Sequence, residues 1–185
     1  MSNILDRRLR YYLSPQWDIY KSIAPHVAGK NVIEIGFGTG LGTTMISQSA
    51  ATVYAVDSDP GLVALAQDLF PMRNVNWLHK GVDDLPAADF DAAVMIEVLE
   101  HVPDWRGAMH NVWNSLAPGG KLYISARNAN ADLRKNELHE REWTAGQFRN
   151  AMLEYFKDVR LWDYTLSQQQ DTNTRMTPLI AVATK

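Results

Sequence analysis

The sequence predicts an α/β fold built on a mostly parallel β-sheet, with helices on both faces. Three observations support this prediction. Short apolar segments alternate with segments of helical spacing, which is the pattern of strands joined by crossover helices. The segment 90–97 is almost continuously apolar, as expected for a strand that is covered on both faces. The segment 31–40 runs from apolar strand residues directly into glycines at every second position, which predicts a sharp turn after a strand.

Length and composition predict one domain, residues 1–185, because 46% hydrophobic residues are enough for a sizeable core. The net charge of −3 argues against tight nucleic-acid binding, which needs a basic face. The chain has no cysteine, and this excludes disulfides, thiol catalysis and cysteine-ligated zinc. No apolar run approaches the roughly 18 residues of a membrane-spanning helix, and Met1–Arg10 lacks the apolar region of an export signal. We therefore expect a soluble, cytoplasmic protein.

Residues 1–30 are predicted to form a helical cap before the first strand. Ser14-Pro15 offers an N-cap followed by proline at the first helical position, and Trp17 and Tyr20 follow at helical spacing. Two interpretations of the aromatic residues stay open. They cover the edge of the sheet, or they form a lid in which Tyr11 and Tyr12 close over a bound ligand and its reaction partner.

The glycine-rich segment is predicted to bind a ligand. After it, residues 41–49 can form a helix whose free N–H groups face the same turn. The spacing differs from the dinucleotide fingerprint G-x-G-x-x-G, because Leu41 and Thr43 stand where a third glycine would be needed. Glu34 lies on the last turn of the strand, where its carboxylate would repel a pyrophosphate and attract a cation.

The segment 52–57 is predicted to be a second strand that ends in Asp57. A carboxylate at this place can accept hydrogen bonds from two ribose hydroxyls, in more than one kind of nucleoside ligand. The alternative role of Asp57, a helix cap, is already filled by Asp59-Pro60 before the predicted helix 61–70. A third strand is predicted at 75–79.

Three segments resemble one family. The pattern E-x-G-x-G-x-G, from Glu34 to Gly40, resembles motif I of the class I S-adenosylmethionine-dependent methyltransferases. The stretch Glu97 to Asp104, E-V-L-E-H-V-P-D, is similar to the small-molecule O-methyltransferases of the ubiquinone-biosynthesis type, and Leu116 to Leu122 carries the family's L-x-P-G-G-x-L. The resemblance implies a Rossmann-like doubly wound sheet of about seven strands, mostly parallel with the last strand antiparallel. It also implies S-adenosylmethionine as cofactor, with S-adenosylhomocysteine as product.

The resemblance and the strand ends together suggest the cofactor-binding residues. The sequence departs from the family at Gly81, where relatives carry an acid that holds the adenine amino group, so Val82 and Asp83 are expected beside the adenine. The full predicted set is Glu34, Gly36, Phe37, Gly38, Thr39, Gly40, Asp57, Ser58, Val82, Asp83, Ile96 and Glu97.

The catalytic candidates are Glu97, His101 and His139. Methyl transfer from a sulfonium needs mainly a site that orients the two reactants and excludes water. A base is also needed where the acceptor must lose a proton. Histidine titrates near neutral pH, so His101 and His139 are the candidate bases, and Glu97 is a candidate to attract the cationic end of the cofactor. We expect no metal, because His101, His110 and His139 lack compact ligand spacing along the chain.

The C-terminal third is predicted to face the substrate. A helix is predicted at 104–116 and a strand at 121–125, after which residues 127–142 are polar. The run 139–144 resembles the segment that small-molecule methyltransferases place before their next helix, here 145–155 with Thr144 as its cap. Strands at 159–165 and 177–184 complete the sheet. Residues 31–126 thus form a cofactor-binding half, and 127–185 carry the insertion and the terminal strands.

These features predict a methyltransferase that acts on a small-molecule acceptor. Two alternatives stay open. The chain is a non-catalytic member of the fold that binds the cofactor or a protein partner, or it is a nicotinamide oxidoreductase, which the glycine spacing disfavours. The sequence gives no indication of the oligomeric state.

Overall fold

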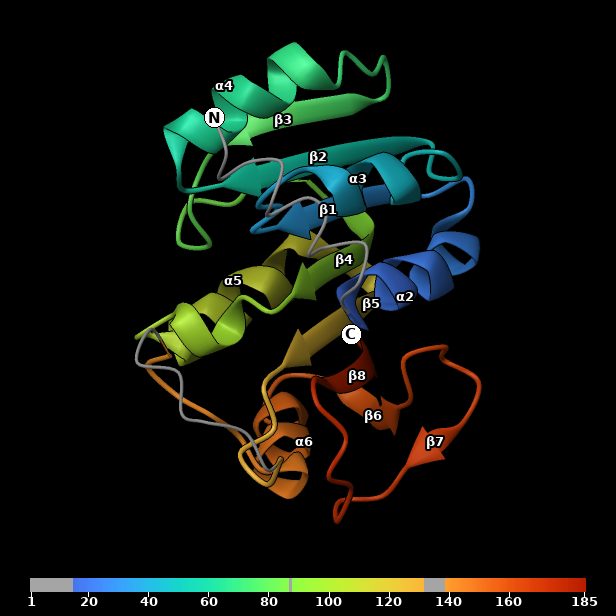
Figure 1. Cartoon of the computed structure of the whole chain (residues 1–185), viewed down its shortest axis with the longest axis vertical. Helices are drawn as coiled ribbons and strands as arrows, with labels where there is room; N and C mark the ends of the chain where they lie inside the picture. Colours follow the sequence, from blue (N-terminus) through green and yellow to red (C-terminus); the bar gives the residue numbers. More distant parts are fainter. Residues whose placement is uncertain (1–14, 87, 132–138) are drawn as a thin grey trace.

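The computed structural model describes residues 15–86, 88–131 and 139–185, which form a single sheet with helices around it (Figure 1). The strands and helices alternate through the first two thirds of the chain, as predicted. The strands are β1 (Asn31–Ile35), β2 (Thr52–Asp57), β3 (Val75–His79), β4 (Phe90–Ile96), β5 (Leu116–Ala126), β6 (Lys157–Trp162), β7 (Gln169–Gln170) and β8 (Leu179–Thr184). The helices are α2 (Pro15–Ile23), η1 (Ala24–Val27), α3 (Leu41–Ile46), α4 (Pro60–Leu69), η2 (Leu99–His101), α5 (Trp105–Ser115) and α6 (Ala145–Leu153).

The sheet has the order β3-β2-β1-β4-β5-β8-β6-β7. Strands β1 to β5 are parallel, and β8 lies between β5 and β6, antiparallel to both. This confirms the doubly wound fold with its inserted antiparallel strand. The sheet has eight strands where about seven were expected, because two residues of the glutamine-rich segment, Gln169 and Gln170, pair with the end of β6.

The core lies in two layers, one on each face of the sheet. Residues of α2, α3 and α4 pack with one set of strand side chains, and residues of α5 and α6 pack with the other set. Successive strand residues point to opposite faces, so Val32 joins the first layer and Ile33 the second. Glu34 therefore points toward the layer of α2 and α3.

Helix α2 packs closely against α3 because Gly42 has no side chain. A Cβ at Gly42 would lie 2.3 Å from the ring of Tyr20. Tyr20 is only 4% exposed and belongs to the core layer on this face of the sheet. Tyr11 and Tyr12, to which the lid interpretation refers, lie outside the described residues.

The turn from α5 to β5 is built on the predicted Pro-Gly-Gly sequence. Asp104 caps α5 by accepting a hydrogen bond from the N–H of Gly107 at 3.0 Å. Gly119 has a φ of 80°, and a Cβ at Gly120 would lie 2.9 Å from the carbonyl of Ala117. Strand β5 begins earlier than predicted, because Leu116 already pairs with Phe90 before the register shifts.

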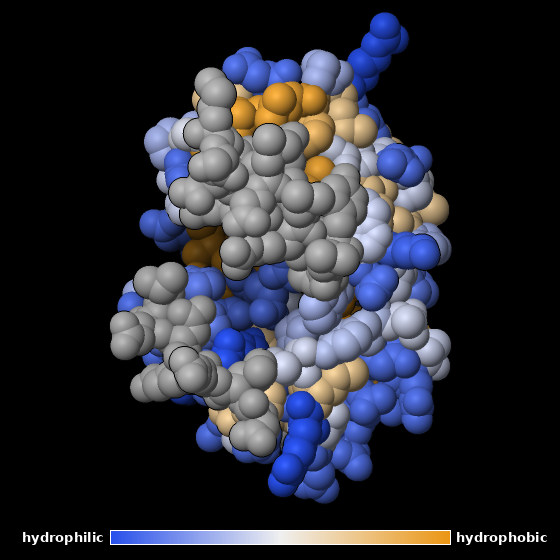
Figure 2. Space-filling model, viewed as in Figure 1, coloured by the Kyte–Doolittle hydropathy of each residue, from blue (hydrophilic) through white to orange (hydrophobic). Residues whose placement is uncertain are grey.

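No helix in the described ranges is long and apolar enough to cross a membrane. The face shown in Figure 2 is largely hydrophilic, with hydrophobic surface at its α4 end, where Leu69 is 44% exposed. Isolated exposed leucines of this kind are normal on protein surfaces.

Candidate active site

The glycine-rich turn adopts backbone conformations that require glycine. Gly36, Gly38 and Gly40 have φ values of 71°, 58° and 77°, which side-chain-bearing residues rarely adopt. At Gly36 a Cβ would also lie 2.5 Å from Val98, in the segment after β4. The glycines thus form the sharp turn that their spacing predicted, and the turn lies close to the segment after β4.

A cavity of about 200 Å³ opens beside this turn. Six residues that were predicted to bind cofactor line it together, from the turn after β1 and from the end of β4. Gln16 and Tyr20 of α2 complete the wall. Sequence reasoning missed Gln16, which has no motif around it, and it did not include Tyr20 among the cofactor-binding residues. The lining residues are Gln16, Tyr20, Gly36, Phe37, Gly38, Thr39, Ile96 and Glu97.

Glu34 lies on β1 before the glycine turn, is fully buried, and is bonded to Tyr20 of the cavity wall. The hydroxyl of Tyr20 donates a hydrogen bond to Oε1 of Glu34 at 2.7 Å, whereas Oε2 has no hydrogen-bond partner among the residues that the structure describes. Burial raises the pKa of Glu34 to about 7, against the opposing effect of nearby hydroxyls. A cation near Glu34 would favour the ionised carboxylate, so the site has the electrostatics for a positively charged ligand.

Asp57 holds the glycine turn in place. Its Oδ2 accepts a hydrogen bond from the N–H of Gly38 at 2.9 Å, and its Oδ1 accepts one from the N–H of Asp59 at 3.0 Å. Asp59 is the N-cap of α4, as predicted, since its side chain accepts from the N–H groups of Gly61 and Leu62. Each Asp57 oxygen keeps a further acceptor position, so the predicted ribose contact is compatible with both bonds. Ser58 follows at the surface.

Glu97 has an unusual backbone and a well-defined side chain. Its φ is 56°, one of the few positive values outside glycine. Oγ of Ser125, on β5, donates to Oε1 of Glu97 at 2.9 Å and accepts from the Glu97 N–H at 3.0 Å. Burial and the nearby Glu100 raise the pKa of Glu97 to about 8. Backbone strain and a perturbed pKa beside a cavity are typical of a functional residue.

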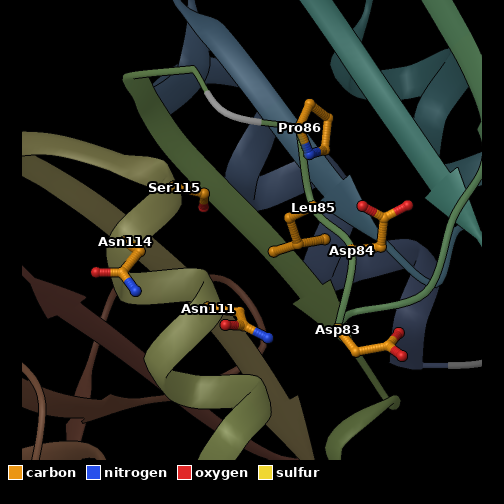
Figure 3. A pocket seen from close by; sticks show the side chains of 7 residues that line it. All are labelled: Asp83, Asp84, Leu85, Pro86, Asn111, Asn114 and Ser115. Carbon is orange, nitrogen blue, oxygen red and sulfur yellow. The ribbon is translucent and has the colours of Figure 1, made fainter.

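The loop after β3 forms a separate hollow of about 180 Å³ (Figure 3). Asp83 lies there with residues of the same loop and of α5, and the carbonyl of Val82 accepts a hydrogen bond from Asn111 at 3.2 Å. Neither Val82 nor Asp83 lines the cavity beside the glycine turn. Their contact with the adenine stays a prediction.

The two candidate histidines lie side by side, although they are far apart in the sequence. The ring centroids of His101 and His139 are 4.8 Å apart. Ligand-type atoms of these two residues and of the buried Glu100 all lie within 4.8 Å of one another. The sequence spacing of His101 and His139 was therefore a wrong reason to expect that they lie apart. His110 is not part of the group formed by Glu100, His101 and His139. Sequence reasoning missed Glu100, which no motif distinguished from Glu97. The expectation of no metal stays a prediction.

Comparison with known proteins identifies the family. The family model described as a methyltransferase domain matches residues 33–124. This range contains the glycine turn, Asp57 and the segment after β4. The ubiquinone biosynthesis O-methyltransferase of Xanthomonas oryzae pv. oryzae is 36% identical over 114 residues, which are 59% of this chain and 48% of that protein.

The chain belongs to the class I S-adenosylmethionine-dependent methyltransferases. A probable S-adenosylmethionine-dependent methyltransferase of Mycolicibacterium smegmatis is 29% identical over 134 residues, 70% of this chain and 52% of that protein. The chain spans about half the length of these curated relatives. The predicted methyltransferase family and its cofactor, S-adenosylmethionine, are thus confirmed.

Solved methyltransferase structures share the fold. The 1,6-didemethyltoxoflavin-N1-methyltransferase of Burkholderia thailandensis, with bound 1,6-didemethyltoxoflavin and S-adenosylhomocysteine, aligns with a TM-score of 0.72. The alignment covers 100% of this chain and 84% of that methyltransferase at 21% identity. At this identity the match supports the predicted Rossmann-like fold, and it carries no residue roles.

Proposed function

We propose that this methyltransferase transfers a methyl group from S-adenosylmethionine to a small-molecule acceptor. The observation that carries the proposal is the cavity between the glycine turn and the end of β4, which contains Gly36, Gly38 and Glu97. In open parallel sheets, ligands bind at the carboxyl ends of the strands where the strand order reverses. Strands β1 and β4 are neighbours at that place.

The residues of the cavity fit the cofactor. Gly36 lets the turn pack against Val98, which a Cβ would approach to 2.5 Å, and Asp57 carries a carboxylate at the position expected for ribose hydroxyls. Glu34 and Glu97 are acids whose pKa values burial raises to about 7 and about 8. A cationic ligand beside them would favour their ionised forms, so binding is coupled to the loss of protons.

Methyl transfer mainly requires that the cofactor and the acceptor are held in the right orientation. The cofactor supplies an electrophilic methyl group on a sulfonium sulfur. Phe37 and Ile96 provide apolar walls, and Tyr20 closes the cavity from α2. These residues exclude water and fix the direction of approach, which are the contributions that speed an in-line displacement. A base for the acceptor is supplied by the histidine group beside Glu97.

Two observations support a small acceptor. The net charge of −3 argues against tight binding to a nucleic acid, which depends on neutralising phosphates. The relatives also point to small molecules by name, one to ubiquinone biosynthesis and one to 1,6-didemethyltoxoflavin. We extend this to the substrate class of the present chain, and we leave the acceptor atom open between oxygen, nitrogen and carbon.

The proposal is tested by methyl transfer from labelled S-adenosylmethionine into fractionated metabolites of a cell extract. We expect label in a small-molecule fraction, and the Asp57→Ala variant should transfer much less. If the protein binds S-adenosylhomocysteine but transfers no label, the non-catalytic alternative is correct. If it neither binds nor transfers, the assignment of this cavity is wrong.

A further inference from the structure

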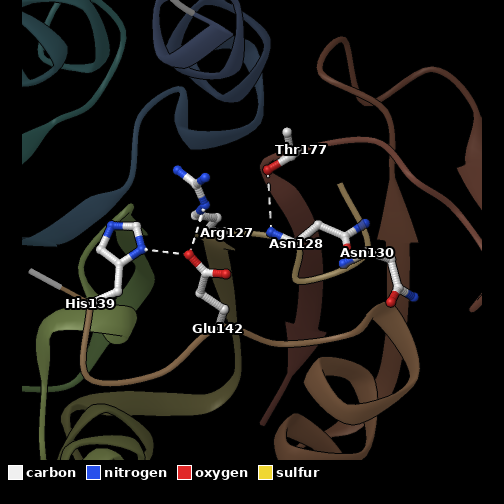
Figure 4. A network of polar contacts seen from close by, with 6 residues as sticks. All are labelled: Arg127, Asn128, Asn130, His139, Glu142 and Thr177. Carbon is white, nitrogen blue, oxygen red and sulfur yellow. Dashed lines mark hydrogen bonds and ion pairs between the residues drawn. The ribbon is translucent and has the colours of Figure 1, made fainter. Parts of the chain in front are cut away.

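Three charged or titratable side chains form a connected group at the end of β5. Nε of Arg127 lies 2.9 Å from Oε1 of Glu142, and Nδ1 of His139 lies 3.3 Å from the same oxygen (Figure 4). The side chains of Arg127, Glu142 and His139 are 18%, 19% and 7% exposed. In Figure 4 one ring nitrogen of His139 is turned toward Glu142 and the other points away. The carboxylate thus contacts only one end of the imidazole.

The backbone holds this group from two sides. The N–H groups of Glu140 and Arg141 donate to the carbonyl of Glu100, at 2.8 Å and 3.3 Å, which ties the segment to η2. The N–H of Trp143 donates to the carbonyl of Arg127 at 3.3 Å, which ties the same segment to β5. Trp143 is buried, so packing adds to these bonds. The relative positions of His139 and Glu142 therefore follow from the fold as well as from their own contact.

The surroundings keep the imidazole neutral but polarised. Burial lowers the pKa of His139, and the nearby charges of His101 and Arg127 act in the same direction. Glu142 opposes them, through its hydrogen bond and its charge. The group also lies close to the cofactor cavity, since His101 and Arg127 both lower the pKa of Glu97 by their charges. A neutral histidine in this place is suited to accept a proton.

We propose that Glu142, held in place by Arg127, is a positioning residue that keeps the proton of His139 on Nδ1 and so makes Nε2 the basic nitrogen. An ionised carboxylate that accepts from Nδ1–H fixes both the tautomer and the orientation of an imidazole. The guanidinium of Arg127, whose Nε lies 2.9 Å from Oε1 of Glu142, fixes the position of this carboxylate. This proposal rests on the proposed function, because the base serves methyl transfer.

In the proposed reaction, proton transfer to His139 accompanies methyl transfer to the acceptor. A hydroxyl or amine acceptor gives its proton to Nε2 of His139, and the electron pair of that acceptor forms the bond to the methyl carbon. The bond between this carbon and sulfur breaks, and its electrons stay on sulfur. The imidazolium of His139, stabilised by Glu142, then releases its proton to solvent.

The test is the tautomer and titration of His139, measured by nitrogen–proton correlation spectra of the full chain labelled with ¹⁵N-histidine. The signal is assigned by its loss in His139→Gln. We expect the Nδ1–H tautomer in the wild type. In Glu142→Gln the pKa of His139 should fall, because an attractive negative charge has been removed, and the Nδ1–H preference should weaken. Glu140→Gln removes an exposed carboxylate two residues away and serves as the matched control, with no change expected.

A wild-type spectrum with the proton on Nε2 would overturn the proposal. So would a Glu142→Gln variant that titrates like the wild type and the Glu140→Gln control. The wild-type measurement decides the tautomer even if Glu142→Gln fails to fold. None of these spectra requires an acceptor, so the result is independent of whether the extract assay finds methyl transfer.

Discussion

The cofactor side and the acceptor side of this site are built in different ways. The cofactor side is formed by one short turn, in which Gly36, Gly38 and Gly40 take up backbone conformations that only glycine adopts easily. The proposed acceptor side brings together side chains from η2, from the end of β5 and from the segment 139–142, namely His101, Arg127, His139 and Glu142. Changes to the first side should alter cofactor binding, and changes to the second should alter transfer after the cofactor has bound.

The largest effect on cofactor affinity is expected at Gly36. In Gly36→Ala the new Cβ meets Val98, a stiff β-branched side chain, and the positive φ costs about 1–2 kcal/mol. Affinity for S-adenosylhomocysteine, measured by calorimetry, should fall roughly 100-fold or more, which is about 2.7 kcal/mol. Gly29→Ala is the matched control, because Gly29 has a φ of 70° and open space around its Cβ, before β1. Gly29→Ala should lose a similar amount of stability but keep its affinity for S-adenosylhomocysteine. If both variants lost the same affinity, the proposed role of Gly36 in cofactor binding would be wrong.

The next prediction is that the stability of the fold depends on pH through Glu34. Because the folded-state pKa is raised from 4.5 to about 7, the folded chain binds more protons than the unfolded chain across this interval. The contribution of Glu34 to stability is thus present below pH 4.5 and is lost as the pH rises through 7. Glu34→Gln, which keeps an acceptor for Tyr20, should be more stable than wild type at pH 9 by on the order of 3 kcal/mol. The two proteins should converge near pH 5 in urea unfolding, and a constant difference would contradict the buried-acid interpretation.

On the acceptor side, His139→Gln should lower kcat roughly 100-fold through loss of the base. Glu142→Gln should lower kcat by about 10-fold, and both variants should keep wild-type affinity for S-adenosylhomocysteine. The double variant should be no slower than His139→Gln, since a positioning residue acts only through the group it positions. Effects that multiply would show that Glu142 acts independently of His139.

A smaller effect is expected at Asp57. Asp57→Ala removes the carboxylate that accepts from Gly38, and the affinity for S-adenosylhomocysteine should fall about 10-fold, a loss of about 1.4 kcal/mol. Asp59→Ala is the control, because loss of this N-cap costs about 1 kcal/mol of stability without touching the cofactor. Unchanged affinity in Asp57→Ala would rule out its predicted ribose contact.

The contrast between a local turn on the cofactor side and contacts between separate segments on the acceptor side also explains what could be predicted from the sequence. The glycine turn, the Asp59 cap and the parallel centre of the sheet follow from local rules of backbone geometry and from alternation of apolar residues. These features were predicted close to where they occur. The family resemblance added the cofactor, and the family match confirmed it.

The sequence named His101 and His139 as candidate bases, but it could not predict how the proposed acceptor side is arranged, because that arrangement depends on contacts between segments far apart in the sequence. Nothing in the local sequence places His139 against His101 or makes Arg127 and Glu142 partners. The role of Tyr20 in bonding Glu34 is of the same kind, since it depends on how α2 packs against Gly42. The extra strand β7 was missed because two glutamines carry no strand signal.

The central claim is that the cavity beside the glycine turn binds S-adenosylmethionine and its product, S-adenosylhomocysteine, and does not bind a nicotinamide dinucleotide. Thermal unfolding with S-adenosylhomocysteine, and separately with NAD, tests it most directly. At about 100 times its Kd, S-adenosylhomocysteine should stabilise the fold by about 2.7 kcal/mol, which raises Tm by roughly 5 to 10 °C. NAD at the same concentration should leave Tm unchanged. Equal shifts with the two ligands, or no shift with either, would contradict the claim.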